Sequence, residues 1–177
     1  IYKKKALFII ETDSELIKSH SIIAATGTEP VRNIFKFKNG KAQNKIFYDI
    51  NRLPKRVGKK HITIVGGGDI AFDYAISLVK KECLVDIVFR SGKPRAIPLL
   101  INRANLSEKI TLIKNSTLLD VQQIDNELNV YILENYNKIK LISDVILIAC
   151  GRKKNIEFIN PMLIKRLKIF KDGYSNI

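Results

Sequence analysis

A cluster of glycines, Gly66 to Gly68, directly follows the apolar, β-branched run Ile62–Val65 and precedes helix-forming sequence. The order strand, G-x-G-x-x-A, helix is typical of the turn that receives the diphosphate of a dinucleotide. In such a turn Gly66 permits the bend, Gly68 lets the backbone approach the phosphates and Ala71 lets the helix lie close to the sheet. The helix N-terminus would offer N–H groups and a positive dipole end to the anion. We therefore predict a nucleotide site formed by Gly66, Gly67, Gly68, Asp69, Ile70 and Ala71.

A second polar set follows the next expected strand, at 85–89. The end of this strand normally reads the adenosine ribose, where an acid favours NAD and basic residues accept the extra phosphate of NADP. Here the strand ends without an acid and continues into Arg90, Ser91, Lys93 and Arg95. Guanidinium groups form paired, charge-assisted hydrogen bonds to phosphate, and Ser91 would add a hydroxyl. The pattern favours NADP; an ordinary basic loop and NAD binding stay open as alternatives.

Other titratable residues near these motifs have structural explanations that compete with chemical ones. Asp73 lies in the first turn of the expected helix, where it would complement the helix dipole or contact the cofactor. Asp86 lies too early in its strand to reach a ribose, so we expect a solvated charge at the strand edge. His20 and His61 have no acidic or cysteine partner at a meaningful spacing. We nominate no general acid or base.

Cys83 and Cys150 are the two cysteines of the chain, and they lie far apart in unrelated contexts. This spacing predicts neither a disulfide framework nor a zinc site and indicates a reducing, cytoplasmic setting. We expect Cys83 to pack where the helix meets the second strand, and Cys150 to be buried at the end of its own strand.

The elements that position these residues alternate between strands and helices. We expect strands at 62–65, 84–90 and 110–113, and helices at 70–81 and 98–106. Right-handed crossovers would place the three strands in one parallel sheet. The fold class is therefore α/β, a Rossmann-like parallel βαβαβ sheet followed by a three-stranded β-meander. The first helix would present one apolar face made of Ala71, Tyr74, Ala75, Leu78 and Val79.

Two segments share the pattern of a hairpin followed by a buried strand that stops at a glycine. The first runs from Ala6 to Gly27 and the second from Leu128 to Gly151, so that they bracket the α/β sequence. The second copy completes the meander. Outside the two copies we expect a loop and linker at 31–60, a short helix within 155–167, and a strand and turn at 167–174.

Composition bounds the partners. With 177 residues and 46% hydrophobic content, the chain can bury one core, and we expect one domain with parts of another. No apolar run approaches a membrane span, and the basic start is too short for a signal peptide. The net charge of +14 would suit nucleic acid, but the lysines are scattered. We expect a solvated basic surface with no nucleic-acid or membrane partner, still compatible with an acidic protein or an anionic cofactor.

These motifs resemble those of the flavin-dependent pyridine nucleotide-disulfide oxidoreductases, especially the thioredoxin-reductase-like branch. Residues 66–73 resemble the family's G-G-G-x-x-A-x-E, with Asp73 in place of the usual Glu. Residues 89–96 resemble H-R-R-x-x-x-R-A, the NADPH phosphate signature, but depart from it at Phe89 and Ser91.

The resemblance extends to the flanks of the α/β sequence. Ala25-Thr26-Gly27 resembles the A-T-G that ends the first part of the flavin domain. Ala149-Cys150-Gly151-Arg152 with Asn155 resembles the second A-T-G-x-x-x-N, which implies a cofactor contact at Gly151. Asp172-Gly173-Tyr174 resembles the D-G-Y/F-I that precedes the flavin-binding G-D segment.

Such a flavoprotein transfers hydride from NADPH to FAD, and the cofactors supply the chemistry. The resemblance divides the chain into a flavin-domain remnant and linker at 1–45, an NAD(P)H-binding domain at 46–151 and a return segment at 152–177. The family's flavin-binding glycine loop and its segment that closes over the flavin are not among these residues. We therefore expect them to bind NAD(P)H weakly and FAD poorly.

Thioredoxin reductases carry a C-x-x-C between the A-T-G and the G-G-G, whereas residues 28–65 hold no cysteine. The resemblance then favours relatives that pass electrons to an acidic, ferredoxin-like carrier or another acceptor, and it allows a homodimer. The alternative is a non-catalytic NAD(P)-binding regulatory module or a degenerate relative that lacks flavin. A colourless protein that titrates with NADPH would favour this alternative, and flavin absorbance would favour the enzyme.

Overall fold

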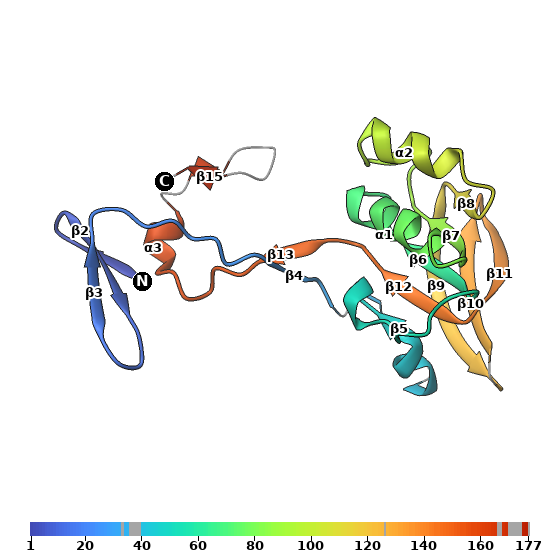
Figure 1. The fold of residues 1–177 in the computed structure, drawn as a ribbon, viewed down its shortest axis with the longest axis horizontal. Coiled ribbons are helices and arrows are strands. Elements are labelled where there is room, and N and C mark those ends of the chain that lie inside the picture. The colour runs from blue at the N-terminus through green and yellow to red at the C-terminus, as the bar shows by residue number, and fades with distance from the viewer. Residues whose placement is uncertain (33, 36–39, 126, 166–167, 170–174, 177) are drawn as a thin grey trace. The chain divides into compact units, whose positions relative to one another are not determined.

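The computed structural model describes residues 1–32, 34–35, 40–125, 127–165, 168–169 and 175–176. The chain divides into two compact units, each with its own sheets (Figure 1). The larger unit is Pro30–Arg152, and the smaller unit joins Ile1–Glu29 to Lys153–Ile177. In the described part of the chain, no helix has the length and apolarity needed to cross a membrane.

The larger unit is built on a five-stranded sheet in the order β5-β12-β6-β7-β8, in which every pair is parallel. These strands are β5 (Ile46–Phe47), β6 (His61–Val65), β7 (Leu84–Val88), β8 (Ile110–Ile113) and β12 (Val145–Ile148). The three strands expected from the α/β sequence and the buried strand of the second hairpin copy are confirmed. These strands consist of nearly continuous apolar residues, because both faces of a parallel sheet are covered and side chains on either face are buried.

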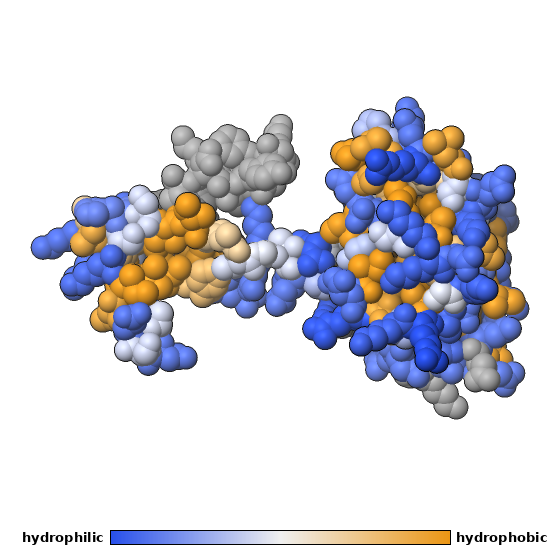
Figure 2. All heavy atoms as spheres, viewed as in Figure 1, coloured by the Kyte–Doolittle hydropathy of each residue, from blue (hydrophilic) through white to orange (hydrophobic). Residues whose placement is uncertain are grey.

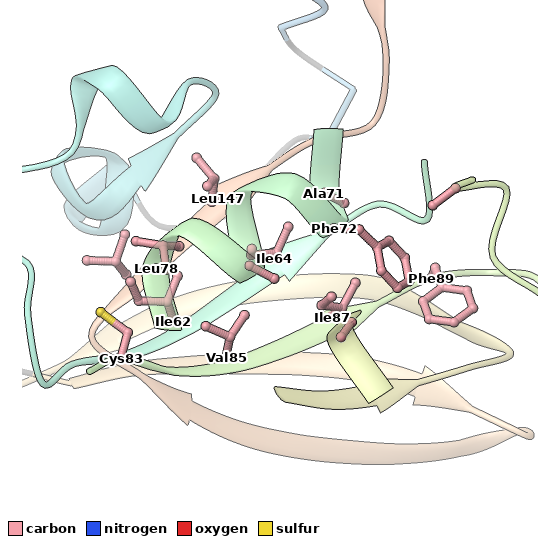
Figure 3. Packing of buried hydrophobic residues seen from close by; sticks show 14 of the residues in the cluster. Ile62, Ile64, Ala71, Phe72, Leu78, Cys83, Val85, Ile87, Phe89 and Leu147 are labelled. Atoms are coloured by element: carbon pink, nitrogen blue, oxygen red, sulfur yellow. The ribbon is translucent and has the colours of Figure 1, made fainter. Parts of the chain in front are cut away.

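Helices α1 (Asp69–Val79) and α2 (Pro98–Asn105) cover one face of this sheet, and both were expected from the sequence (Figures 1 and 3). Alternate residues of β6 and β7, among them Ile62, Ile64, Val85 and Ile87, pack under α1 in one buried cluster. Sequence periodicity missed Phe72, which is fully buried. Its ring lies 6.4 Å from that of Phe89, centroid to centroid. The buried face of α1 is therefore wider than the predicted one and includes Phe72.

The meander covers the other face of the sheet (Figure 1). It consists of β9 (Ser116–Ile124), β10 (Glu127–Glu134) and β11 (Asn137–Ser143), antiparallel in the order β11-β10-β9. The sheet residues that point away from the helices form the second buried cluster with it. That cluster includes Val65, Val88, Ile146 and Ile148 from the sheet, and Leu118, Val121, Leu128, Val130 and Ile132 from the meander. The expected α/β fold with a meander is confirmed.

A polar pair joins adjacent strands of the sheet. The Nε2 of His61 lies 2.9 Å from the Oδ2 of Asp86. The Asp86 residue is only 7% exposed. The expectation of a solvated Asp86 and a histidine without an acidic partner is therefore wrong. The two residues are diagonal neighbours on β6 and β7, since Asp86 pairs in register with Thr63. Spacing along the chain does not show this proximity.

A second buried pair links β6 to the meander, where the hydroxyls of Thr63 and Ser143 lie 2.5 Å apart. Ser143→Ala leaves a buried hydroxyl without this partner, so we expect a loss of about 1–2 kcal/mol of unfolding free energy. In a urea-denaturation cycle, Thr63→Val combined with Ser143→Ala should cost less than the sum of the single variants. Strict additivity would show that the two hydroxyls do not interact.

The segment that leads into the sheet, expected as a loop and linker, contains short elements. Besides β5 it has two 3-10 helices, η1 (Gly40–Lys45) and η2 (Ile50–Arg52). A strand of two residues carries no periodic signal, which is why β5 was missed.

The smaller unit contains the expected first hairpin. Strands β1 (Tyr2–Lys4), β2 (Leu7–Glu11) and β3 (Leu16–Ser19) form an antiparallel sheet in that order. The expected short helix is α3 (Pro161–Ile164), and β14 (Lys168–Ile169) pairs with β15 (Ser175–Asn176). The Asp172-Gly173-Tyr174 motif lies outside the described residues. Strands β4 (Thr28–Pro30) and β13 (Arg152–Lys154) pair with each other, and the division between the units passes through both.

The buried strand expected at 22–27 is wrong. These residues form no strand, and Ile23 is 94% exposed. A strand needs neighbours for its backbone N–H and C=O groups, and no described strand pairs with this run. Hydrophobic atoms gather on the visible surface of the smaller unit (Figure 2). Among its described residues, the exposed large apolar side chains are Tyr2, Leu16, Ile17, Ile23, Phe158 and Met162.

Candidate nucleotide-binding site

The candidate site lies at the carboxyl edge of the parallel sheet. The chain runs from β6 outward through β7 to β8, and then returns to β12 on the other side of β6. This reversal creates a topological switch point between β6 and β12, the place where open α/β sheets bind ligands. The glycine turn leaves β6 at this point.

Gly66 makes the first close contact of the turn. Its φ is +146°, and its N–H donates to the carbonyl oxygen of Val88 at 2.9 Å. A Cβ on Gly66 would lie 2.4 Å from the carbonyl oxygen of Ala149. The turn therefore requires glycine here, both for its backbone conformation and for its packing against the end of β12.

The other two glycines have different surroundings. A Cβ on Gly67 would lie 3.0 Å from Cβ of Phe89, whereas a Cβ on Gly68 would meet no atom within 4 Å. Gly68 is the N-cap of α1, with φ −97° and ψ 178°. The space beside Gly68 is open, as close approach of a phosphate to the backbone would require.

The first turn of α1 presents free amides. The N–H groups of Ala71 and Phe72 donate to the carbonyl oxygen of Gly68, at 3.0 and 3.4 Å. For the N–H groups of Gly68, Asp69 and Ile70 there is no acceptor among the residues that the structure describes. Asp69 and Ile70 are exposed, so the positive end of the helix dipole faces solvent. Such an end receives anions.

The basic loop after β7 lies against the glycine turn. Arg90, Ser91 and Arg95 are exposed, and the Ser91 hydroxyl donates to the carbonyl oxygen of Lys93 at 2.6 Å. One end of the loop is fixed by the turn after β8, because the Asn115 N–H donates to the Ser91 carbonyl oxygen at 3.3 Å. The other end is fixed by the glycine turn, whose Gly67 carbonyl oxygen accepts from the Arg95 N–H at 2.6 Å.

Cys150 lies two residues beyond the end of β12, and the residue is exposed, so its expected burial is wrong. The buried part of the strand ends at Ile148. Its sulfur nevertheless rests against the sheet, where Sγ donates to the Val65 carbonyl oxygen at 3.2 Å. Loss of solvent around the sulfur raises the pKa of Cys150, and the Arg90 and Arg95 guanidinium groups oppose that rise. The backbone bond from Arg95 to Gly67 places the end of the basic loop beside the glycine turn.

The raised pKa of Cys150 predicts slow alkylation. Less thiolate is present below that pKa, so iodoacetamide should modify Cys150 more slowly than free cysteine at pH 8. The rate should rise as the pH passes the raised pKa. Cys83 is the internal control, because it is buried as expected and donates to the Val57 carbonyl oxygen, so it should react only on unfolding. Alkylation of Cys150 at the free-cysteine rate would contradict the effect of burial.

The structure also places the remaining predicted residues. Ala71 is fully buried beneath the turn and acts in helix packing. Asp73 is exposed on α1. Gly151 has φ +122°, and its carbonyl oxygen accepts from the Val31 N–H at 3.1 Å. Within the described residues no group of three or more His, Cys, Asp or Glu side chains could hold a metal ion.

Sequence reasoning missed the contacts that join the two motifs. Besides the Gly67–Arg95 bond, Oδ1 of Asp69 accepts from the Ile97 N–H at 2.8 Å. Tyr74 was predicted on the apolar face of α1 and does pack against the buried cluster, but its proximity to η2 was not predicted. Burial first, and then the charge of Asp49, raise the pKa of its hydroxyl. No spacing rule signals such contacts, because they join turns that are far apart along the chain.

Comparison with known proteins agrees with this geometry. The model of the pyridine nucleotide-disulphide oxidoreductase family matches residues 1–173. The chain belongs to this family. The ferredoxin–NADP reductase of Rickettsia canadensis is 35% identical over 167 residues, which cover 87% of this chain and 48% of that protein. The chain thus spans about half the length of the curated relatives it matches.

Solved structures of family members share the fold. The thioredoxin reductase of Lactococcus lactis, in its FR conformation, is similar with a TM-score of 0.74 and 22% identity, covering 99% of this chain and 60% of that one. The thioredoxin reductase of T. acidophilum also gives a TM-score of 0.74, at 19% identity, covering 98% of this chain and 57% of that one. At these identities the likeness concerns the fold alone.

Proposed function

We propose that this chain is the NAD(P)H-binding part of a flavin-dependent oxidoreductase that transfers hydride from NADPH to FAD. The observation that carries the proposal is the open N-terminus of α1 beside Gly68, at the switch point of the sheet. Family membership and the similarity to a relative named for NADP support it.

The proposal gives each predicted residue a role. The diphosphate lies against the amides that follow Gly66 and Gly67, where Gly68, Asp69 and Ile70 have N–H groups to donate. The additional phosphate of NADPH binds the Arg90 and Arg95 guanidinium groups, and the Ser91 hydroxyl can still accept a hydrogen bond. Gly151 follows β12, and Asp73 lies on α1. In this proposal the ribose and the nicotinamide extend from the diphosphate toward these two residues. NAD remains the alternative to NADP.

FAD, when bound, takes the hydride and supplies the redox chemistry. We propose that flavin binding uses further residues of a longer polypeptide, since the curated relatives are about twice as long as this chain. In this proposal the smaller unit belongs to the flavin domain, which would cover its exposed apolar residues. The proposed domains remain 1–45, 46–151 and 152–177.

The proposed electron acceptor is an acidic carrier protein or another acceptor, reached without a C-x-x-C. Residues 28–65 hold no cysteine, and Cys83 and Cys150 lie at opposite ends of the sheet, one buried at the amino edge and one exposed at the carboxyl edge. The net charge of +14 suits an acidic partner. A homodimer stays a prediction.

A titration of the chain with NADPH and NADH, followed by nicotinamide fluorescence, tests the proposal. We expect saturable binding that is tighter for NADPH. No binding of either nucleotide would contradict it, and steeply salt-dependent binding of RNA instead would indicate a basic nucleic-acid protein. Flavin absorbance of the protein purified from its natural source would favour the enzyme over a non-catalytic regulatory module.

A further inference from the structure

Asp69 poses an electrostatic problem at the proposed diphosphate site. Its side chain begins α1, at the same exposed helix end whose amides would receive an anion. A carboxylate at this position interacts favourably with the helix dipole and stabilises α1 when no ligand is bound. The same carboxylate repels a bound diphosphate, which is also negative. Its presence in a nucleotide-binding turn therefore needs another explanation.

The carboxylate is already engaged. Its Oδ1 accepts from the Ile97 N–H at 2.8 Å, two residues beyond the point where the Arg95 N–H donates to Gly67. The basic loop is thus bound to the glycine turn at two alternate positions, Arg95 to Gly67 and Ile97 to Asp69. Between them Ala96 is buried, so the loop packs against the unit at this place.

The second of these bonds also sets the start of α2. Ile97 is the N-cap of α2, with φ −63° and ψ 148°, and Pro98 follows it as the first helical residue. Neither residue offers a capping side chain, so the bond to Asp69 fixes the position of this junction relative to α1. Arg95 lies two residues upstream on the same loop.

We propose that Asp69 is a positioning residue for NADPH selectivity: its carboxylate holds the Arg90–Ile97 loop so that Arg95 stands beside the glycine turn before the ligand arrives. The inference rests on the proposed function. It assigns the Asp69 side chain an action through the Ile97 N–H, whereas only the backbone N–H of Asp69 would contact the diphosphate directly. A loop held in its binding conformation loses less entropy when the phosphate binds, which raises the affinity for NADPH and leaves NADH unaffected.

The test compares affinities for NADPH and NADH in three variants of the chain, with thermal unfolding followed for each. Asp69→Ala removes the acceptor, and we expect the ratio of NADPH to NADH affinity to fall about tenfold. Asp69→Asn keeps an acceptor oxygen and should retain the ratio, while binding of both nucleotides tightens because a like charge is gone. Ile97→Pro removes the donor at a φ that proline adopts, and should lower the ratio as Asp69→Ala does.

The control variant is Glu108→Ala, an exposed acid just before β8 at the amino edge of the sheet, which should leave the ratio unchanged. Arg95→Ala separates the two possible failures. If Arg95→Ala lowers the ratio and the Asp69→Ala and Ile97→Pro variants do not, the positioning inference alone is overturned. If Arg95→Ala has no effect on the ratio, the phosphate assignment and the inference both fail. Equal losses for both nucleotides with Asp69→Ala would show a structural role only.

Discussion

Gly66→Ala is expected to destabilise the larger unit by about 3–5 kcal/mol, a large fraction of the stability of a typical domain. The added Cβ would meet the Ala149 carbonyl oxygen at 2.4 Å, and backbone atoms of two adjacent strands cannot move aside cheaply. A φ of +146° adds strain of its own for any residue with a side chain. Urea denaturation followed by circular dichroism measures the effect.

Gly68→Ala is the matched control, because its Cβ would meet no atom within 4 Å. We expect its unfolding free energy to stay within about 1 kcal/mol of the parent value. Its NADPH affinity should nevertheless fall about tenfold, since the new methyl group occupies the space through which a phosphate approaches. If Gly66→Ala were as stable as Gly68→Ala, the tight packing of the turn against β12 would be refuted.

The double variant Arg90→Ala with Arg95→Ala is expected to weaken NADPH binding about 100-fold and to spare NADH. Charge-assisted hydrogen bonds to a phosphate contribute about 1.5–3 kcal/mol each, and two exposed ones at the lower end of this range give a loss of this size. NADH lacks the additional phosphate and has nothing to lose at this loop. Isothermal titration calorimetry with both nucleotides gives the two affinities.

The double variant Arg103→Ala with Lys109→Ala removes the same charge from exposed positions away from the glycine turn. It should change both affinities slightly and equally, as general electrostatics requires. An equal loss of NADPH and NADH binding in the Arg90 and Arg95 variant would refute the phosphate assignment, and no loss for either would do the same.

The sequence was sufficient to assign three of the five strands to the parallel sheet, because their signals are local. Alternation from β-branched runs to helical periodicity located β6, α1, β7, α2 and β8, and the glycine cluster located the turn between β6 and α1. Ala71 was predicted as a packing residue and is fully buried.

The errors concern contacts between segments far apart along the chain. Asp86 was expected to be solvated and is bound to His61, because the register of β6 against β7 decides what lies beside it. The run at 22–27 has the composition of a buried strand, but no strand among the residues that the structure describes pairs with it. Cys150 follows a buried strand yet lies beyond its buried part. Local patterns specify which element forms, and only the assembled sheet specifies its neighbours.

The most direct test of the nucleotide site is an NMR titration of the isotopically labelled chain with NADPH. The amide resonances of Gly68, Asp69 and Ile70 should shift most, because a bound diphosphate would accept hydrogen bonds from these N–H groups. Amides at the opposite edge of the sheet, such as those of Glu108 and Lys109, should barely move. If other resonances shifted while those of the three turn amides did not, a diphosphate bound at the start of α1 would be contradicted. The absence of any shift at saturating NADPH would contradict it as well.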